Sequence, residues 1–191
     1  LFASFETEPL GTASIAQTHR ARTRDGDNVV VKVQRPGVEA TMRSDLNLLH
    51  LAARILEASI EEMQFFGVVS IVEEFEKGLL GELDFNQELS NLLEVQRNLD
   101  PERKVVVPRP HPELVTQRVL VMERLEGFHA DDIDGMRAAG IETAEVLRSL
   151  MIAFLEGAMI YGVFHGDLHG GNLVVMRDGR VGLFDYGMTG R

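Results

Sequence analysis

The chain has 191 residues, no cysteine and a formal net charge of -11 at pH 7. Its length and its 45% content of apolar residues suffice for one domain or two small lobes with a sizeable core. The lack of cysteine excludes a disulfide framework or a thiolate metal site, and the acidity argues against a nucleic-acid partner and against general attraction to anionic membranes.

Three strands are predicted at the start of the chain, at residues 2–5, 15–22 and 28–34. Small residues before the second strand, including Ala13 and Ser14, would let the backbone approach phosphate groups closely. The third strand carries Lys32 among valines, where burial is costly unless an anion meets the ammonium group. Nucleotide phosphates would supply that anion, whereas a lysine on an edge strand would simply point to solvent.

Two helices are predicted next. The first covers residues 38–59, because apolar residues recur there along one stripe, and residues 64–69 interrupt the pattern. The second is predicted to start at Ser70, whose spacing to Glu73 matches a capping box, and to continue towards Leu99.

Strands are predicted again at residues 105–107 and 115–124, and residues 126–127 begin the crossing to a second lobe. A helix is predicted over residues 142–161. It includes most of the most apolar stretch of the chain, residues 149–164. That stretch contains a glutamate and is too short to span a bilayer, so it predicts a buried helix.

The most informative motif lies near the end of the chain. His165, Asp167 and Asn172 form a His-x-Asp-x-x-x-x-Asn pattern, and Asp185 and Gly187 follow in Asp-Tyr-Gly. Phosphoryl transfer needs a carboxylate to orient the acceptor and oxygen ligands to hold Mg²⁺. The segment between Asn172 and Asp185 predicts a tight hairpin that would bring these two residues together. The alternative is a polar loop beside a hairpin, without a catalytic role.

Several segments along nearly the whole chain match the motifs of one family in that family's order. They are Ala13-Ser14-Ile15-Ala16-Gln17, Val31-Lys32-Val33-Gln34-Arg35-Pro36-Gly37-Val38, Glu82-Leu83-Asp84 with Glu88 and Asn91, Val119 to Glu123, His165 to Asn172, and Asp185 to Met188. In these segments the chain resembles the UbiB/AarF family of atypical kinases, whose members support ubiquinone and related isoprenoid-quinone metabolism.

The resemblance implies the catalytic roles. Lys32 would contact the α- and β-phosphates of the nucleotide and pair with Glu88. Asp167 would be the catalytic carboxylate, and Asn172 and Asp185 would bind Mg²⁺.

The resemblance also implies the nucleotide site and a family-specific acidic motif. Ala13 and Ser14 would bind ATP or ADP together with Lys32, and Met122 and Glu123 would lie at the adenine hinge, where backbone groups make the contacts. Separately, Glu82 and Asp84 would form the Glu-x-Asp pair of the family. On one continuous helix, Asp84, Glu88 and Asn91 would share a face that Glu82 does not, so Glu88 is the preferred partner of Lys32.

The chain departs from the family pattern at several positions. Gly11 and Thr12 stand where the family is usually alanine-rich, which leaves the preference for ATP or ADP open. Tyr186 replaces a phenylalanine, and Gly170 a proline. The family's upstream Lys-x-Gly-Gln motif and the helices that follow Asp-x-Gly are absent, so we expect a fragment of a longer protein.

We predict different roles for the two histidines of this loop. His165 resembles the histidine that orders the backbone of this loop in kinases, and we expect that structural role rather than acid–base chemistry. His169 stands where ordinary kinases often have lysine, and it either approaches the transferred phosphate or packs against the loop.

We therefore expect an α+β, protein-kinase-like two-lobed fold. Residues 1–124 would form an antiparallel-sheet N-lobe with inserted helices, and residues 125–191 the beginning of a mainly helical C-lobe. The expected function is that of a Mg²⁺-dependent, ATP-binding atypical kinase or ATPase that supports ubiquinone or related isoprenoid-lipid metabolism. The alternatives are a small-molecule phosphotransferase of the aminoglycoside or choline kinase type and a nucleotide-binding pseudokinase scaffold.

The expected partners are a nucleotide and, by resemblance, a quinone-pathway lipid or a membrane-bound biosynthetic complex, but no nucleic acid. Nothing at Leu1 resembles a signal peptide, so we expect an intracellular protein. Membrane association, at a bacterial inner membrane, mitochondrion or plastid, is implied by the resemblance alone.

Overall fold

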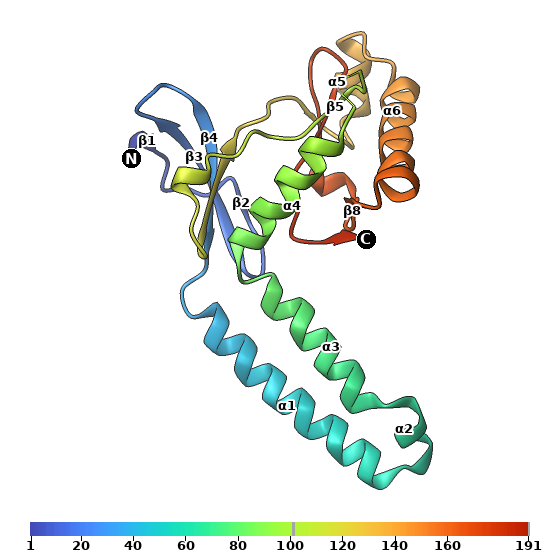
Figure 1. Cartoon of the computed structure of the whole chain (residues 1–191). Coiled ribbons are helices and arrows are strands. Elements are labelled where there is room, and N and C mark those ends of the chain that lie inside the picture. The colour runs from blue at the N-terminus through green and yellow to red at the C-terminus, as the bar shows by residue number, and fades with distance from the viewer. Residues whose placement is uncertain (101, 191) are drawn as a thin grey trace.

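Strands gather into two main sheets, and a pair of helices projects away from them (Figure 1). The computed structural model describes residues 1–100 and 102–190, so Arg191, the last residue of the predicted second lobe, lies outside the described part. Helices and strands are mixed along the chain, and the larger sheet is wholly antiparallel. The predicted α+β class and the antiparallel first sheet are confirmed.

The first sheet positions the lysine of the predicted site. It contains β1 (Phe2–Phe5), β2 (Gly11–Thr12), β3 (Ala16–Thr23), β4 (Asn28–Gln34) and β6 (Val119–Glu123). In the centre, Lys32 of β4 lies opposite Thr18 on one side and Leu120 on the other. Because side chains alternate along a strand, Val31 packs into a core on one face and Lys32 points to the other.

The projecting helices are α1 (Val38–Ser59), α2 (Glu61–Phe66) and α3 (Val68–Gly81). The predicted interruption at residues 64–69 is only partly right, because residues 64–66 belong to α2 and the chain turns at Gly67, whose φ is 62°. The predicted capping box is wrong. Gly67 precedes the first residue of α3, and Ser70 lies inside the helix. A left-handed glycine, which needs no side-chain cap to reverse the chain, replaces the expected motif.

The predicted helix from Ser70 to Leu99 is broken at residues 82–84. The second half is α4 (Phe85–Asn98), and the Asp84 side chain caps it by accepting a 2.9 Å hydrogen bond from the backbone N–H of Asn86. The backbone N–H of Phe85 donates to the carbonyl of Gln117 at 3.1 Å, which anchors Phe85 to the turn that precedes β6. Glu82 and Asp84 therefore lie in a turn, and the single helical face predicted for Asp84 and Glu88 does not exist.

The second sheet runs in the order β5-β10-β9-β7 and carries the predicted metal-binding motifs. Its strands are β5 (Val105–Val106), β7 (Phe128–His129), β9 (Leu173–Val175) and β10 (Val181–Leu183). The antiparallel pair β9–β10 is the predicted hairpin between Asn172 and Asp185. β5 comes from the range predicted as N-lobe, yet it pairs in parallel with β10.

Helices and short segments complete the second lobe. They are the 3₁₀ turn Pro112–Leu114, α5 (Ile133–Ala138), α6 (Thr143–Glu156), a π-helical turn (Gly157–Tyr161), β8 (Phe164–His165), the 3₁₀ turn Gly170–Asn172 and β11 (Thr189–Gly190). The buried helix predicted over residues 142–161 is only half buried, because Leu150 is covered while Met151 and Leu155 are exposed. Among the described residues, no helix is both long and apolar enough to cross a membrane.

One core joins the two lobes. Phe85 and Leu92 of α4 pack with Leu120 of β6, and the same cluster includes Leu183 and Tyr186 from the second lobe. All of these side chains are buried. Helix α4 therefore fixes the first sheet relative to the segment that contains Asp185.

Candidate functional site

Lys32 is the centre of the site. Its ammonium nitrogen lies 3.0 and 2.9 Å from the two carboxylate oxygens of Glu88, and 3.0 Å from Oδ1 of Asp185. These three residues come from β4, α4 and the segment after β10, and they are far apart in the sequence. The structure therefore brings together three of the predicted site residues, including the proposed Lys32–Glu88 pair.

The cluster contains one positive charge, on Lys32, and two carboxylates, those of Glu88 and Asp185. Burial pulls the pKa of Lys32 down, but the neighbouring charges of Glu88 and Asp185 and their hydrogen bonds outweigh it, so its pKa lies above the ordinary value. The pKa of Glu88 is also raised, chiefly by burial and further by Asp185, although Lys32 acts against the shift. One cation thus serves two carboxylates, and Lys32 stays charged at physiological pH.

Glu82 adds a further carboxylate at the edge of this cluster. Burial raises its pKa, and the nearby charges of Asp185 and Asp167 raise it further while Lys32 lowers it. The two acidic residues of the Glu-x-Asp motif thus differ. Glu82 belongs to the electrostatic environment of the site, whereas the Asp84 side chain caps α4.

The Asp-Tyr-Gly segment has an unusual backbone that α4 supports. Among the described non-glycine residues, Asp185 alone has a positive φ, of 67°. Tyr186 is fully buried, its ring lies edge-on to His165 at 5.1 Å, and its carbonyl accepts a 2.9 Å hydrogen bond from the side chain of Asn91. The burial of Tyr186 and its contact with Asn91 hold Asp185 in its strained, positive-φ conformation, in which its side chain contacts Lys32.

The catalytic loop is tied to the same segment. His165 is buried and donates from Nε2 to the carbonyl of Phe184 at 3.1 Å, while its Nδ1 accepts from the backbone N–H of Asp167 at 3.2 Å. Both ring nitrogens are thereby used for backbone contacts, which supports the predicted structural role. Asn172 donates from Nδ2 to the carbonyl oxygen of Asp167 at 3.0 Å and to its Oδ2 at 3.3 Å.

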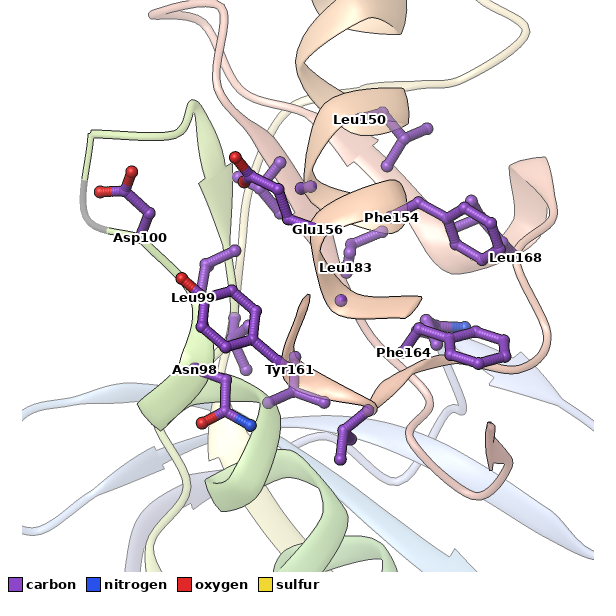
Figure 2. A pocket seen from close by; sticks show the side chains of 17 residues that line it. Asn98, Leu99, Asp100, Leu150, Phe154, Glu156, Tyr161, Phe164, Leu168 and Leu183 are labelled. Atoms are coloured by element: carbon purple, nitrogen blue, oxygen red, sulfur yellow. The ribbon is translucent and has the colours of Figure 1, made fainter. Parts of the chain in front are cut away.

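A small apolar cavity of about 40 Å³ lies behind this loop, between the end of α4 and α6 (Figure 2). Leu168 of the loop lies beside Phe154 and Phe164, whose rings meet edge to face at 5.3 Å. Glu156, which also lines the cavity, pairs with Arg103. The loop therefore rests on a packed apolar layer, which restricts where Asp167 can move.

A larger cleft of about 640 Å³ opens between the two sheets. It is lined by apolar residues from both lobes, including Val30, Met122, Leu173 and Phe184. Glu123 also lines it, and the backbone N–H of Glu123 donates to the carbonyl of Arg109 at 2.8 Å. A cleft of this size with an apolar interior suits a planar base, and Met122 and Glu123 lie where the sequence predicts the adenine hinge.

The structure places Ala13 and Ser14 away from that cleft. They lie in the turn between β2 and β3, where the backbone N–H of Ala13 donates to the carbonyl of Ala16 at 2.8 Å. Among the residues that line the cleft, Gly11 and Thr18 represent this hairpin instead. A nucleotide contact from Ala13 or Ser14 would require the turn to fold over the cleft.

Asn172 and Asp185 suit a magnesium ion that is shared with a nucleotide. In the described part of the chain, no three His, Cys, Asp or Glu side chains lie close enough together to hold a metal by themselves. Mg²⁺ commonly uses one or two protein oxygens together with substrate phosphates and water. Because Nδ2 of Asn172 donates to Asp167, its Oδ1 is the atom left to ligate, and the half-exposed carboxylate of Asp185 could supply the second oxygen.

Two contacts of the site were not anticipated from the sequence. Gln34, which follows Lys32 by two residues on β4, donates from its side-chain amide to the carbonyl of Leu83 and so holds the turn of the Glu-x-Asp motif. Asp185 pairs directly with Lys32 in addition to Glu88. Gln34 belongs to the Lys-Val-Gln segment that matches the family motif. That match was the signal in the sequence that could have suggested the contact between Gln34 and Leu83.

Comparison with known proteins identifies the family and the fold. The family model described as the ABC1 atypical kinase-like domain matches residues 1–191. An uncharacterized protein of Mycobacterium tuberculosis is 39% identical over 194 residues, which cover 100% of this chain and 40% of that protein. A protein named probable protein kinase UbiB from Vibrio parahaemolyticus is 36% identical over 175 residues, which cover 91% of this chain and 32% of the relative.

Two further relatives extend the comparison. An uncharacterized aarF domain-containing protein kinase of Arabidopsis thaliana, named as chloroplastic, is 35% identical over 187 residues, covering 96% of this chain and 35% of the relative. A solved structure described as the complex of Rv3197 with erythromycin, from Mycobacterium tuberculosis, superposes with a TM-score of 0.79 at 29% identity, covering 98% of this chain and 46% of that chain.

The chain thus spans 32% to 40% of the length of these curated relatives. The match to the family model extends from the first residue to the last, and the solved relative has the same arrangement of lobes over nearly the whole chain. The predicted kinase-like fold and the predicted resemblance are confirmed, and the chain belongs to the ABC1 atypical kinase-like family, which includes the UbiB and aarF relatives.

Proposed function

We propose that this chain carries the nucleotide-binding and catalytic residues of a Mg²⁺-dependent, ATP-binding atypical kinase or ATPase that supports ubiquinone or related isoprenoid-lipid metabolism. The observation that carries the proposal is the buried ammonium of Lys32 held between Glu88 and Asp185. Membership of the ABC1 family and the names of the UbiB and aarF relatives support the reaction class and the pathway.

The unequal exposure of the two carboxylates indicates where phosphates would bind. The Glu88 side chain is only 4% exposed, whereas that of Asp185 is 45% exposed. A phosphate oxygen would therefore reach Lys32 from the Asp185 side, while Glu88 keeps the ammonium in place. In this arrangement Lys32 stabilises the negative charge of the nucleotide, which is the main electrostatic task in phosphoryl transfer.

Asp167 would orient the attacking hydroxyl or water. Its backbone is fixed by His165, and its side chain by Asn172. A bound Mg²⁺ would neutralise charge on the nucleotide phosphates, with Asn172 and Asp185 as its protein ligands. The adenine would lie in the cleft against Met122.

Nucleotide-dependent thermal stability tests this proposal. Melting of the chain is measured without nucleotide and with ATP or ADP, each with and without Mg²⁺. An upward shift that requires both nucleotide and Mg²⁺ is expected, because a ligand that binds only the folded state stabilises it. The ratio of the shifts in melting temperature with ATP and with ADP shows which nucleotide the chain prefers when Gly11 is present in the β2–β3 hairpin.

Two variants serve as controls. Asp185→Asn should lose the Mg²⁺-dependent part of the shift, and Asp167→Asn should keep the shift while phosphate release falls by on the order of a hundredfold or more. A cooperatively melting sample that shows no shift with any nucleotide would refute the nucleotide site. Retained binding without any turnover in the unmodified chain would favour the pseudokinase scaffold instead.

A small-molecule phosphotransferase is the second candidate, because the solved relative Rv3197 is described in complex with erythromycin, a small molecule. Phosphate transfer from radiolabelled ATP separates the candidates. Labelled isoprenoid-quinone precursors in detergent would support the first proposal, and labelled erythromycin or aminoglycoside would support the second.

The proposed partners follow from the same family membership. A quinone-pathway lipid or a membrane-bound biosynthetic complex is the proposed partner, at a bacterial inner membrane, mitochondrion or plastid. The net charge of -11 speaks against a nucleic-acid partner. Co-sedimentation with vesicles and with solubilised quinone-biosynthesis enzymes tests this part separately from nucleotide binding.

A further inference from the structure

His169 lies two residues after the catalytic carboxylate, and its imidazole contacts both ends of the loop. Its Nδ1 accepts a 3.0 Å hydrogen bond from the backbone N–H of Gly171, and its Nε2 lies 3.5 Å from Oδ2 of Asp167. We infer that His169 is a positioning residue that holds Oδ2 of Asp167, so that Oδ1 alone receives the acceptor hydroxyl. This inference rests on the proposed phosphoryl-transfer function.

The contact with Gly171 determines the tautomer of His169. A ring nitrogen that accepts a hydrogen bond has no proton, so the proton of the neutral ring is on Nε2. Nε2–H is then the donor of the ring, and Nε2 is the atom that lies near Oδ2 of Asp167. The separation of 3.5 Å is long for a hydrogen bond, as is common in catalytic sites without substrate, which tighten when the complex forms.

Asn172 acts on the same oxygen from the other side. Its Nδ2 lies 3.3 Å from Oδ2 of Asp167, and it also bonds the Asp167 backbone carbonyl at 3.0 Å. Two donors therefore converge on Oδ2, one from each residue. Oδ1 is the oxygen that remains for an incoming hydroxyl, which explains how a carboxylate that is 43% exposed can present one defined oxygen.

The proposed reaction transfers the γ-phosphoryl group of ATP to an acceptor hydroxyl. The acceptor hydroxyl gives its proton to Oδ1 of Asp167, and its oxygen forms a bond to the γ-phosphorus of ATP. The bond between that phosphorus and the bridging oxygen breaks, and ADP leaves with the electron pair. His169 takes part in none of these bonds. It fixes the plane of the carboxylate that receives the proton.

Glycine at position 171 is needed for this arrangement. A Cβ at Gly171 would lie 2.7 Å from Cε1 and 2.9 Å from Nδ1 of His169, so an alanine would push the imidazole away. A Cβ at the neighbouring Gly170 would meet only the Cβ of Ala130, at 3.5 Å, which is an ordinary contact. The chain therefore offers a matched pair of substitutions in one short segment, Gly171→Ala and Gly170→Ala.

Two replacements of His169 test its contacts with Gly171 and with Asp167 separately. In His169→Asn, the side-chain oxygen can still accept from the N–H of Gly171, but the shorter side chain does not reach Asp167. In His169→Gln, the longer side chain places an amide N–H near the position of Nε2. We expect kcat for phosphate transfer or release to fall about tenfold or more in the Asn and Gly171→Ala variants and to be largely retained in the Gln and Gly170→Ala variants.

The melting temperature should change little in all four variants. The KM for Mg²⁺-ATP should change little in the two His169 variants and in Gly170→Ala, because His169 acts on the carboxylate, whereas Gly171 also lines the cleft, so the KM of Gly171→Ala does not report on His169. Equal losses of kcat in the Asn and Gln variants would overturn the inference, since the donor to Asp167 would then not matter. So would an unchanged kcat in both His169 variants.

The tautomer is measured independently of turnover. In the full chain with ¹⁵N-labelled histidine, long-range nitrogen–proton spectra of neutral His169 should show a proton on Nε2 and none on Nδ1, and Gly171→Ala should weaken this preference. A proton on Nδ1 overturns the inference whether or not nucleotide binds. Absence of nucleotide binding alone would refute the proposed function, and the tautomer would still decide the placement of His169.

Discussion

At the scale of single residues, the site depends on one buried cation shared by two carboxylates. Removing one partner of such a group leaves an uncompensated buried charge, whereas replacing both with apolar residues can be nearly neutral. Lys32 and Glu88 are the more buried pair, with side chains 9% and 4% exposed. Their contribution to stability can therefore be separated from their proposed role in nucleotide binding.

We expect Lys32→Met alone to lower the free energy of unfolding by about 3–5 kcal/mol, because Glu88 would lose its counter-ion. The double variant Lys32→Met with Glu88→Leu should recover most of that loss while still failing to bind Mg²⁺-ATP. Urea unfolding of both single variants and the double variant measures the coupling. Additive effects of the two substitutions would contradict the pairing.

Glu82 predicts a specific dependence on pH. Its folded pKa lies above the ordinary 4.5 because of burial and the charges of Asp185 and Asp167, so the folded state binds more protons than the unfolded state between the two values. Stability associated with Glu82 is thus present at low pH and is lost as the pH rises through the folded pKa.

Substitution of Glu82 by glutamine should therefore stabilise the chain at about pH 8 by less than about 1 kcal/mol, because the half-buried group is partly screened by solvent. The difference should vanish at about pH 4, where both the folded and the unfolded carboxyl groups are largely protonated. Urea unfolding of the two proteins at both values is the measurement. A stabilisation that persists unchanged at acidic pH would show that charge is not its cause.

Tyr186 gives a prediction about a neutral group. Its ring fills the core, whereas its hydroxyl does not stabilise the fold. The ring is fully buried, and the hydroxyl has no hydrogen-bond partner among the described residues. Burial raises the pKa of Tyr186 well above its usual range, so the hydroxyl stays neutral. Tyr186→Phe should raise the melting temperature, with a gain of up to about 1–3 kcal/mol from the removed unsatisfied group. Tyr161→Phe, at an exposed position, is the matched control and should change nothing.

At the scale of secondary-structure elements, the turn between α3 and α4 decides how the site is assembled. Asp84 caps α4, Gln34 of β4 holds the carbonyl of Leu83, and Phe85 bonds to the turn that precedes β6. Helix α4 in turn presents Glu88 to Lys32 and Asn91 to Tyr186. The Glu-x-Asp motif therefore joins a sheet to a helix, and its aspartate contributes mainly by fixing where that helix begins.

Asp84→Ala should cost about 1 kcal/mol of stability, because the N–H of Asn86 loses its acceptor at the start of α4. Asp84→Asn keeps an oxygen at that position and should cost only a few tenths of a kcal/mol. Thermal unfolding compares the two. Equal destabilisation by alanine and asparagine would mean that the charge of Asp84, and not the cap, is what matters.

At the scale of the whole molecule, a shared core and a shared sheet blur the predicted boundary after residue 124. β5 joins the second sheet through β10, and α4 packs against side chains of both lobes. The pair α1–α3 projects from this body, and its end carries the exposed rings of Phe65 and Phe66 (Figure 1). The cleft that we propose for the nucleotide lies between two lobes whose relative placement is set mainly by α4.

Much of this could be predicted from the sequence because it depends on local patterns. The strand around Lys32 alternates in the expected way, α1 has the predicted ends, and the hairpin after Asn172 follows from its turn residues. The candidate catalytic motifs were recognisable because phosphoryl transfer, the proposed reaction, requires those residue types at that spacing. Local sequence therefore determined the main elements and the chemistry-bearing residues of this protein.

Only the tertiary structure decided which of these residues meet. The break at residues 82–84 depends on bonds to Gln34 and Gln117, which are remote in sequence, in addition to the local cap that Asp84 provides. The ion pair of Lys32 with Asp185 likewise joins residues 153 positions apart. Long-range packing selects among conformations that local propensity leaves close in free energy, so the geometry of the site arises only when both lobes are assembled around α4.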